Sequence, residues 1–190
     1  LLSLQVVGLI ALWLYLRRII QRWRDQQKIR STELLHLAQH DALTGIGNRA
    51  LFELRMAEAL KQSRRNASAI GLMLIDIDHF KTVNDQYGHA IGDLLLIKMA
   101  SELKSLSRES DTVTRLGGDE FAIILTNLEN QYNASTISKK VLSLFDKPML
   151  FDNHEIKISV SIGIASFPDD AKDYDELLRK ADMALYEVKR

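Results

Sequence analysis

The apolar positions of the chain repeat with two different periods, and each period predicts one type of element. Spacings of three and four residues, as from Leu51 to Leu54, place apolar side chains on one face of a helix. Alternation, as from Ile156 to Ile164, is typical of a half-buried strand, and the apolar run at residues 69–77 predicts a strand buried on both faces. The elements predicted in this way are helices at residues 49–65, 91–106 and 134–145 and strands at residues 69–77, 112–116, 121–125 and 156–164.

A last helix is predicted from its first turn. Asp173 and Glu176 form a capping box, and apolar residues from Leu177 to Val188 give the following segment one apolar face. The elements alternate between helix and strand, with a hairpin at the centre. This order predicts an α/β (α+β) fold, in which helices cover a central sheet of mixed direction.

Residues 1–16 are apolar apart from Ser3, Gln5 and Gly8, and arginines follow at positions 17, 18, 22 and 24. The run is shorter than the about 20 residues that span a bilayer. Because the chain starts without methionine, we interpret the run as the C-terminal part of a transmembrane helix, with the arginines on the cytoplasmic side. A signal peptide fits less well, because the basic cluster follows the apolar run. A buried core helix is the alternative.

Residues 17–38 contain neither glycine nor proline and are rich in residues that favour helix. Their apolar positions keep no sustained heptad, so a short coiled coil in a dimer and a solvated connecting helix both stay open. The chain is therefore predicted to have three parts: a membrane segment at residues 1–16, a connecting, signalling helix at 17–38 and a folded domain at 39–190.

Charge and composition exclude some classes of function. Lys+Arg and Asp+Glu both number 25, so nothing in the charge balance suggests a surface for nucleic acid. The chain has no cysteine, which rules out a disulfide framework and a zinc-thiolate site.

The chemistry of the chain centres on a glycine pair, Gly117 and Gly118, between two predicted strands. Glycine accepts the positive φ of a two-residue hairpin turn, and it lets a ligand approach the backbone closely. Asp119 and Glu120 follow at once, so the turn suits a cation and a polyphosphate. An ordinary hairpin with a charged tip is the alternative for these residues taken alone.

Residues 117–121 read Gly-Gly-Asp-Glu-Phe, the name motif of the GGDEF domains, the bacterial diguanylate cyclases. Residues 40–49 resemble the opening signature of this family, and residues 76–93 resemble its second signature. The resemblance spans roughly residues 37–190. It implies a fold like the palm of nucleotide cyclases and the condensation of two GTP into cyclic di-GMP with release of two pyrophosphates.

The resemblance also implies a metal site for Mg²⁺ or Mn²⁺, whose ligands are Asp76, Asp119 and the backbone carbonyl of Ile77. Asp76 ends the buried strand, at a sheet edge where ligands bind, and magnesium uses one or two protein carboxylates together with phosphates. Asp119, with Glu120 beside it, is implied to activate the ribose 3′-hydroxyl. Asp78 is expected to support the loop. The alternative for Asp76 is a cap of the next helical turn.

Asn84 and Asp93 resemble the residues of the family that bind guanine. A carboxylate accepts hydrogen bonds from the base N1–H and amine, whereas adenine would leave these acceptors unpaired, so the pair predicts selectivity for GTP over ATP. The alternative for Asp93 is a helix N-cap. The resemblance implies further contacts with the substrate. Lys81 and Lys189 contact phosphate and His89 lines the nucleotide pocket. Phe80, Gly117 and Gly118 are further substrate-binding residues. A core or turn residue is the alternative for His89.

Arg108 and Asp111 match an Arg-x-x-Asp site that binds the product and inhibits the enzyme in this family. A guanidinium forks onto phosphate or a guanine edge, which suits that ligand. A surface salt bridge between the two residues is the alternative. The resemblance further implies a homodimer, because each domain holds one GTP, and an inner (cytoplasmic) membrane location in a bacterium with the catalytic domain in the cytoplasm. A domain that has lost catalysis and only senses cyclic di-GMP or GTP, or relays a signal, is the rival interpretation.

Overall fold

The structure is a computed structural model that describes residues 4–128, 132–151 and 154–190. The chain divides into two compact units, Leu1–Ala38 and Gln39–Arg190. Helix α1 (Leu4–Gln39) accounts for nearly all of the first unit, and the second unit holds the sheet and the other helices.

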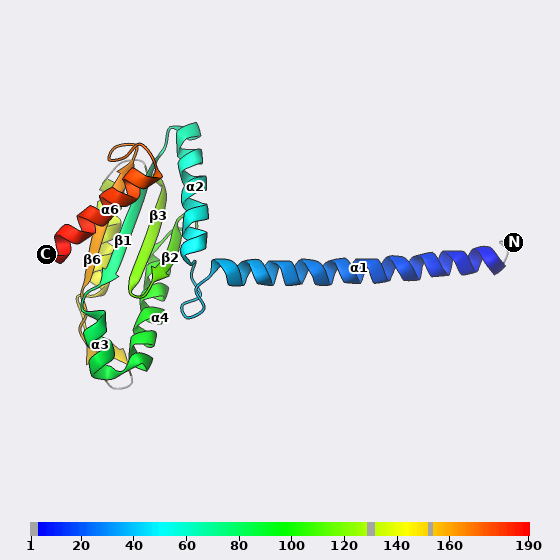
Figure 1. The fold of residues 1–190 in the computed structure, drawn as a ribbon, viewed down its shortest axis with the longest axis horizontal. Helices are drawn as coiled ribbons and strands as arrows, with labels where there is room; N and C mark the ends of the chain where they lie inside the picture. The colour runs from blue at the N-terminus through cyan, green and yellow to red at the C-terminus, as the bar shows by residue number, and fades with distance from the viewer. Residues whose placement is uncertain (1–3, 129–131, 152–153) are drawn as a thin grey trace. The chain divides into compact units, whose positions relative to one another are not determined.

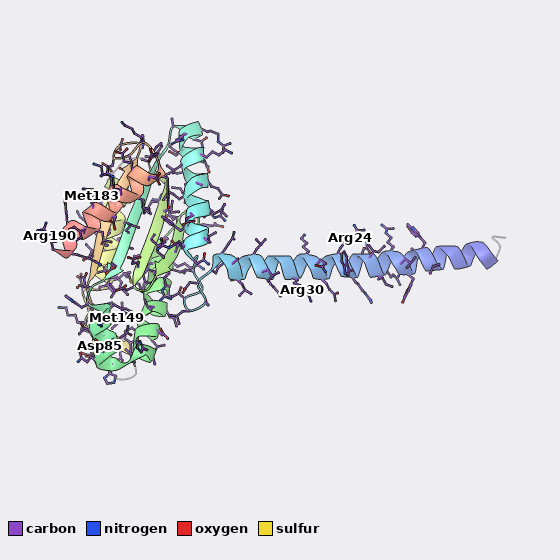
Figure 2. All side chains as sticks on the ribbon, viewed as in Figure 1. Arg24, Arg30, Asp85, Met149, Met183 and Arg190 are labelled. Carbon is purple, nitrogen blue, oxygen red and sulfur yellow. The ribbon has the colours of Figure 1, made fainter. Side chains whose placement is uncertain are left out.

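Helix α1 is one uninterrupted helix of 36 residues, so it covers both the predicted membrane segment and the predicted connecting helix. Figure 2 shows side chains projecting along it, Arg24 and Arg30 among them. In the part of the chain that the structure describes, no helix has a stretch long and apolar enough to cross a membrane. The membrane segment at residues 1–16 thus stays a prediction, and its first three residues lie outside the described ones.

Among the described residues, the main sheet contains four strands in the order β2-β3-β1-β6 (Figure 1). Every neighbouring pair is antiparallel, whereas the sequence predicted a sheet of mixed direction. The reason is the position of β3. Strands β1 and β2 run in the same direction, but β3 lies between them in the sheet and runs in the opposite direction, so β1 and β2 are not neighbours. The strands are β1 (Ala69–Ile77), β2 (Thr112–Gly117), β3 (Glu120–Leu128) and β6 (Val160–Phe167).

Helices cover both faces of this sheet, which confirms the predicted α/β (α+β) class. One face packs against α2 (Arg49–Asn66) and α6 (Tyr174–Lys189), and Figure 1 shows α6 lying across β6 and β1. The opposite face packs against α3 (Phe80–Tyr87), α4 (His89–Leu106), α5 (Tyr132–Leu144) and the hairpin of β4 (Met149–Phe151) and β5 (His154–Ile156).

Strand β1 divides its side chains between the two faces. Met73 and Ile75 join the cluster with α4, while Leu72 and Leu74 join the cluster with α2 and α6. The strand is buried along almost its whole length, as the apolar run predicted. Because side chains alternate along a strand, Asp76 faces the same side as Leu74, which is the side that α6 covers.

Three local details differ from the sequence prediction. The strand expected at residues 156–164 is two strands, since β5 ends at Ile156 and β6 begins at Val160. The apolar alternation in the sequence continues between the two strands because the side chain of Ile158 is also buried. Such a pattern shows which side chains are buried, but it does not show where one strand ends and the next begins with a different pairing strand. Helix α3 was not predicted, since its 8 residues are too few to show an apolar period, and the β4–β5 hairpin was not predicted either.

The start of α6 agrees with the predicted cap. The Asp173 carboxylate accepts a hydrogen bond from the Glu176 N–H at 2.9 Å. The reciprocal bond goes one residue further back, because Glu176 Oε2 accepts from the Lys172 N–H at 3.0 Å. This cap begins the helix that carries Lys189 at its other end.

Candidate active site

The candidate site lies where β1 ends and the β2–β3 hairpin turns. Asp76 stands opposite Glu120 of β3 and Ser161 of β6 in the strand register. Gly117 pairs with Glu120, so the two residues of the turn are Gly118 and Asp119. The hairpin that the glycine pair predicted is therefore confirmed, with the turn one residue later than the pair.

The two glycines of the hairpin have backbone conformations that other residues adopt rarely. Gly117 has φ 148° and Gly118 has φ 54°. A Cβ atom built on either glycine would meet no atom within 4 Å, so the space around the turn is open. The glycines are thus needed for the backbone conformation, and the open space lets a ligand approach the turn.

Asp76 is a buried carboxylate, with 7% of its surface exposed, and it forms an ion pair with a lysine. Lys189 Nζ of α6 lies 2.7 Å from Asp76 Oδ1. The pKa of Asp76 is raised, mainly because burial disfavours the charged carboxylate. The negative charges of Asp119 and Asp78 raise the pKa further, whereas the bond to Lys189 lowers it without cancelling the rise. Asp76 lies within β1 and the N-cap position of α3 is His79, so Asp76 is not a helix cap.

Asp76 and Asp119 together fit a hard divalent cation. Each carboxylate offers hard oxygen ligands, and the two lie close enough for the charge of Asp119 to affect Asp76. Among the described residues, no group of three or more His, Cys, Asp or Glu side chains could hold a metal. A pair fits Mg²⁺, which takes one or two carboxylates and completes its octahedron with water and phosphate oxygens. Ile77 could contribute only backbone atoms, since its side chain is buried in the core.

Asp78 holds the loop after β1 in place, as expected from the sequence. Its carboxylate accepts hydrogen bonds from Ser159 Oγ at 2.6 Å and from Ser161 Oγ at 2.7 Å. Its backbone N–H donates to the Ser159 carbonyl at 3.0 Å. These bonds join the end of β1 to the start of β6.

The residues predicted to bind the nucleotide base lie on α3 and α4. Asn84 packs against Gly92 of α4, where a Cβ atom would overlap Asn84 Oδ1 and would lie 3.3 Å from Phe80 Cζ. Asp93 is exposed and follows Gly92 inside α4, whose N-cap position is Gly88, so Asp93 is not a helix cap. Lys81 and His89 are exposed as well, which excludes a core histidine.

Arg108 and Asp111 lie at the other end of the hairpin, before β2 begins. Asp111 accepts hydrogen bonds from the backbone N–H groups of Arg108 at 3.0 Å and Thr126 at 3.2 Å. Within residues 4–128, 132–151 and 154–190 the Arg108 guanidinium forms no ion pair, so the alternative of a salt bridge to Asp111 is not realised. Both residues line a cavity of about 670 Å³, together with Arg55 and Lys104.

Sequence reasoning missed Arg115, the arginine that holds the turn between β2 and β3. Arg115 donates to the Gly118 carbonyl from Nε at 2.9 Å and from Nη2 at 2.8 Å, and its Nη1 lies 3.0 Å from Asp41 Oδ1. Asp41 also accepts from the Thr44 N–H at 2.9 Å and the Thr44 hydroxyl at 2.6 Å. Asp41 stands in the opening signature and Arg115 lies two residues before Gly117, but no local pattern signals a pair so far apart in the sequence.

The pKa of Asp41 reflects this set of contacts. Burial raises it, but the hydrogen bonds from Thr44 and Arg115 outweigh burial, so the pKa lies below the ordinary value of 3.8. Because the pKa of Asp41 is lower in the folded chain than in the unfolded chain, its ionised carboxylate stabilises the fold at pH values above the pKa in the unfolded chain. This stabilisation is lost as the pH falls through the pKa in the folded chain.

We therefore expect Asp41→Asn to lower the free energy of unfolding at pH 7 by about 1.5–3 kcal/mol, the range for hydrogen bonds to a charged group. The difference from the wild type should shrink as the pH falls below about 4, because the carboxyl of the unfolded wild-type chain takes up its proton at a higher pH than that of the folded chain. Urea unfolding of both proteins between pH 7 and pH 3.5 measures this. Asp146→Asn, an exposed carboxylate outside these contacts, should show no such difference. A constant difference at every pH would contradict the assignment to the charge.

Comparisons with known proteins agree with this fold. Residues 38–190 match the family model described as diguanylate cyclase, GGDEF domain. The chain belongs to the GGDEF-domain family.

Two of the curated relatives from Pseudomonas aeruginosa illustrate the likeness. Diguanylate cyclase TpbB is 38% identical over 172 residues, which are 90% of this chain and 40% of that protein. The bifunctional diguanylate cyclase and cyclic di-GMP phosphodiesterase MucR is 41% identical over 157 residues, which are 83% of this chain and 23% of that protein. The chain thus spans less than half the length of these curated relatives.

Many solved structures resemble the chain, and two of them show the extent of the likeness. The isolated GGDEF domain of TpbB (YfiN) has a TM-score of 0.77 and 41% identity, over 80% of this chain and 88% of that one. The coiled coil and GGDEF domain of DgcB from Caulobacter crescentus, in complex with c-di-GMP, has a TM-score of 0.82 and 26% identity, over 96% of this chain and 95% of that one.

Proposed function

We propose that the chain contains the catalytic domain of a diguanylate cyclase, which condenses two GTP into cyclic di-GMP and releases two pyrophosphates. The observation that carries the proposal is the acidic pair Asp76 and Asp119 at the open glycine turn. Membership of the GGDEF family supports the same reaction. The names of similar proteins, diguanylate cyclase TpbB among them, support it further.

Asp76, Asp119 and the Ile77 carbonyl would hold a divalent metal, Mg²⁺ or Mn²⁺. When bound, such an ion supplies positive charge that stabilises the phosphate oxygens in the transition state. Asp119 accepts the proton of the ribose 3′-hydroxyl as that oxygen attacks the α-phosphate of the GTP in the facing domain, and pyrophosphate leaves. Glu120 is exposed and lies 3.9 Å from Arg49 Nη2, a pair too exposed to fix its position strongly.

The triphosphate contacts cations and backbone around the turn. Lys189 leaves Asp76 and meets the triphosphate, which its length and partial exposure allow. Lys81 in the first turn of α3 provides a second positive charge. Gly117 and Gly118 admit the phosphates because no Cβ fills the space beside them. Asn84 and Asp93 bind guanine, with Phe80 and His89 at the edge of the same pocket.

Two domains must meet, because each provides one GTP, and α1 offers a surface for pairing with a second copy. Its large apolar side chains at Trp13, Leu16, Ile20 and Trp23 follow the 3-4-3 spacing of a coiled-coil seam and are exposed. Gln27 and Arg30 interrupt this spacing before Leu34. A short parallel pairing of α1 with a second copy is the dimer that we propose.

We further propose that residues 1–16 end a transmembrane helix, which holds the chain at the inner membrane of a bacterium with the catalytic domain in the cytoplasm. The aromatic residues Trp13 and Tyr15, followed by arginines, support this orientation. Fractionation of cells that express the full-length protein tests it, and recovery outside the membrane fraction would overturn it.

Incubation of the purified chain with GTP and Mg²⁺, followed by chromatography of the nucleotides, tests the activity. Cyclic di-GMP and pyrophosphate are the expected products. Tight binding of GTP or cyclic di-GMP without turnover, in a chain shown to dimerise, would support the alternative of a sensor or relay domain.

Product inhibition is the regulation that we propose for Arg108 and Asp111. Cyclic di-GMP binds in their cavity through charge-assisted hydrogen bonds to the guanidinium. Strand β2 (Thr112–Gly117) separates this cavity from Asp119, and at about 3.3 Å per residue the two sites are roughly 20 Å apart. Product bound there therefore acts allosterically, by holding two domains apart, and does not compete for the GTP site.

Arg108→Ala is expected to weaken inhibition about ten- to a hundredfold and to leave the uninhibited rate unchanged, since a hydrogen bond to a charged group contributes about 1.5–3 kcal/mol. The measurement is the initial rate against added cyclic di-GMP at several GTP concentrations. Lys147→Ala, an exposed cation outside this cavity, serves as the control. Full relief of inhibition by excess GTP, or an equally sensitive mutant, would remove the inhibitory role from Arg108.

A further inference from the structure

Gly92 occupies a position in α4 that does not require glycine for its backbone conformation. Its N–H donates to the Gly88 carbonyl at 3.2 Å, an ordinary helical bond, and the positive-φ glycine of this region is Gly88. A glycine inside a helix costs about 0.5–1 kcal/mol relative to alanine. The reason for glycine at this position must therefore be the space that a side chain would fill.

That space is filled by Asn84. A Cβ atom on Gly92 would overlap Oδ1 of Asn84 and would lie 3.0 Å from its Cγ, so the side-chain amide rests directly on the bare Cα of Gly92. Phe80 closes the same side, with Cζ 3.3 Å from the Cβ position. Asp93 follows Gly92 directly, so the contact of Asn84 with Gly92 lies one residue from the other residue implied to bind guanine.

We propose that Gly92 is a positioning residue for base recognition, a role that rests on the proposed function. It lets Asn84 and Asp93 approach each other closely enough to contact one guanine together. A hydrogen bond needs a donor–acceptor distance of about 2.7–3.2 Å, so even a small displacement of the amide weakens its contact with the base. Any side chain at position 92 would push Asn84 away from this arrangement.

The test compares the wild type with Gly92→Ala in three measurements. These are calorimetric binding of a non-hydrolysable GTP analogue and of the matching ATP analogue in the presence of Mg²⁺, steady-state kinetics, and thermal unfolding. We expect affinity for the GTP analogue to fall about ten- to a hundredfold and affinity for the ATP analogue to change little. KM should rise more than kcat falls. The melting temperature should not fall by more than a few degrees, because alanine favours the helix and the displaced amide is partly exposed.

A double variant distinguishes a positioning role of Gly92 from a role in packing alone. If Gly92 acts through Asn84, then adding Gly92→Ala to Asn84→Ala should cost no further affinity, and any loss of melting temperature seen in Gly92→Ala should be restored in the double variant. Lys98→Ala, on the exposed side of α4, is the control and should behave as the wild type.

Unchanged affinity for the GTP analogue in Gly92→Ala would overturn the role of Gly92 while leaving the proposed function in place. Losses that simply add in the double variant would also overturn it, because the effect would then not pass through Asn84. A wild-type chain that fails to bind the GTP analogue would overturn the proposed function itself, and this role with it.

Discussion

Asp119→Ala is expected to abolish formation of cyclic di-GMP while the fold is retained. Asp119 lies in a two-residue turn outside both core clusters, so its removal takes nothing from the packing. Its charge contributes to the raised pKa of Asp76, so removing that charge relieves a repulsion between carboxylates. The melting temperature should therefore stay the same or rise.

The loss of activity should be large because one side chain is proposed to do two things. General-base action alone contributes about 10²–10⁴-fold, and a lost metal ligand adds to that loss. The measurement is the initial rate of product formation from GTP and Mg²⁺, with thermal unfolding of the same samples. Asp146→Ala removes an exposed carboxylate elsewhere and should keep the wild-type rate. A folded Asp119→Ala protein with a near wild-type rate would refute the assignment of the site.

Gly163→Ala is expected to lower the free energy of unfolding more than any of the other substitutions proposed for this chain. Gly163 lies in β6 opposite Leu74, directly under α6. A Cβ atom there would overlap the carbonyl oxygen of Ala181 and the backbone nitrogen of Leu185. Backbone atoms cannot rotate away as a side chain can, so α6 would have to shift as a whole. The expected cost is about 3 kcal/mol, the upper end for overpacking, or roughly 6–12 °C in melting temperature.

The matched control is Gly71→Ala in the neighbouring strand β1. Its Cβ would meet only side-chain atoms, Leu128 Cδ1 at 3.0 Å and Leu125 Cδ1 at 3.5 Å, which can move. Both substitutions change the unfolded chain equally, so the difference between them reports the native contacts. Because α6 carries Lys189 to Asp76, Gly163→Ala should also lose activity. Equal melting temperatures for the two variants would contradict this account of β6 and α6.

The local elements could be predicted from the sequence because their signals are local. The apolar run at residues 69–77 predicted a strand buried on both faces, and β1 is such a strand. Gly117 and Gly118 predicted a hairpin, and Asp173 predicted the start of α6. Each of these depends on residues in one short segment of the chain, where the period of an element or the chemistry of a turn leaves a readable pattern.

The motifs allowed the candidate site residues to be named, and the resemblance implied that Asp76 and Asp119 share a metal, but neither revealed that Lys189 contacts Asp76. Asp76, Asp119 and Lys189 stand far apart in the sequence, yet Lys189 reaches Asp76 because α6 crosses β1. In the same way, the contact of Asn84 with Gly92 depends on how α3 and α4 pack.

Only the tertiary structure decided the order of the strands and the contacts that hold the turn between β2 and β3. The insertion of β3 between β1 and β2 makes every neighbouring pair antiparallel, against the mixed direction that was predicted. The bond of Arg115 to Asp41 and the close approach of Gly163 to α6 have no counterpart in any local pattern. The physical reason is that apolar period and turn chemistry act over a few residues, whereas these contacts follow from which distant segments share a face of the sheet.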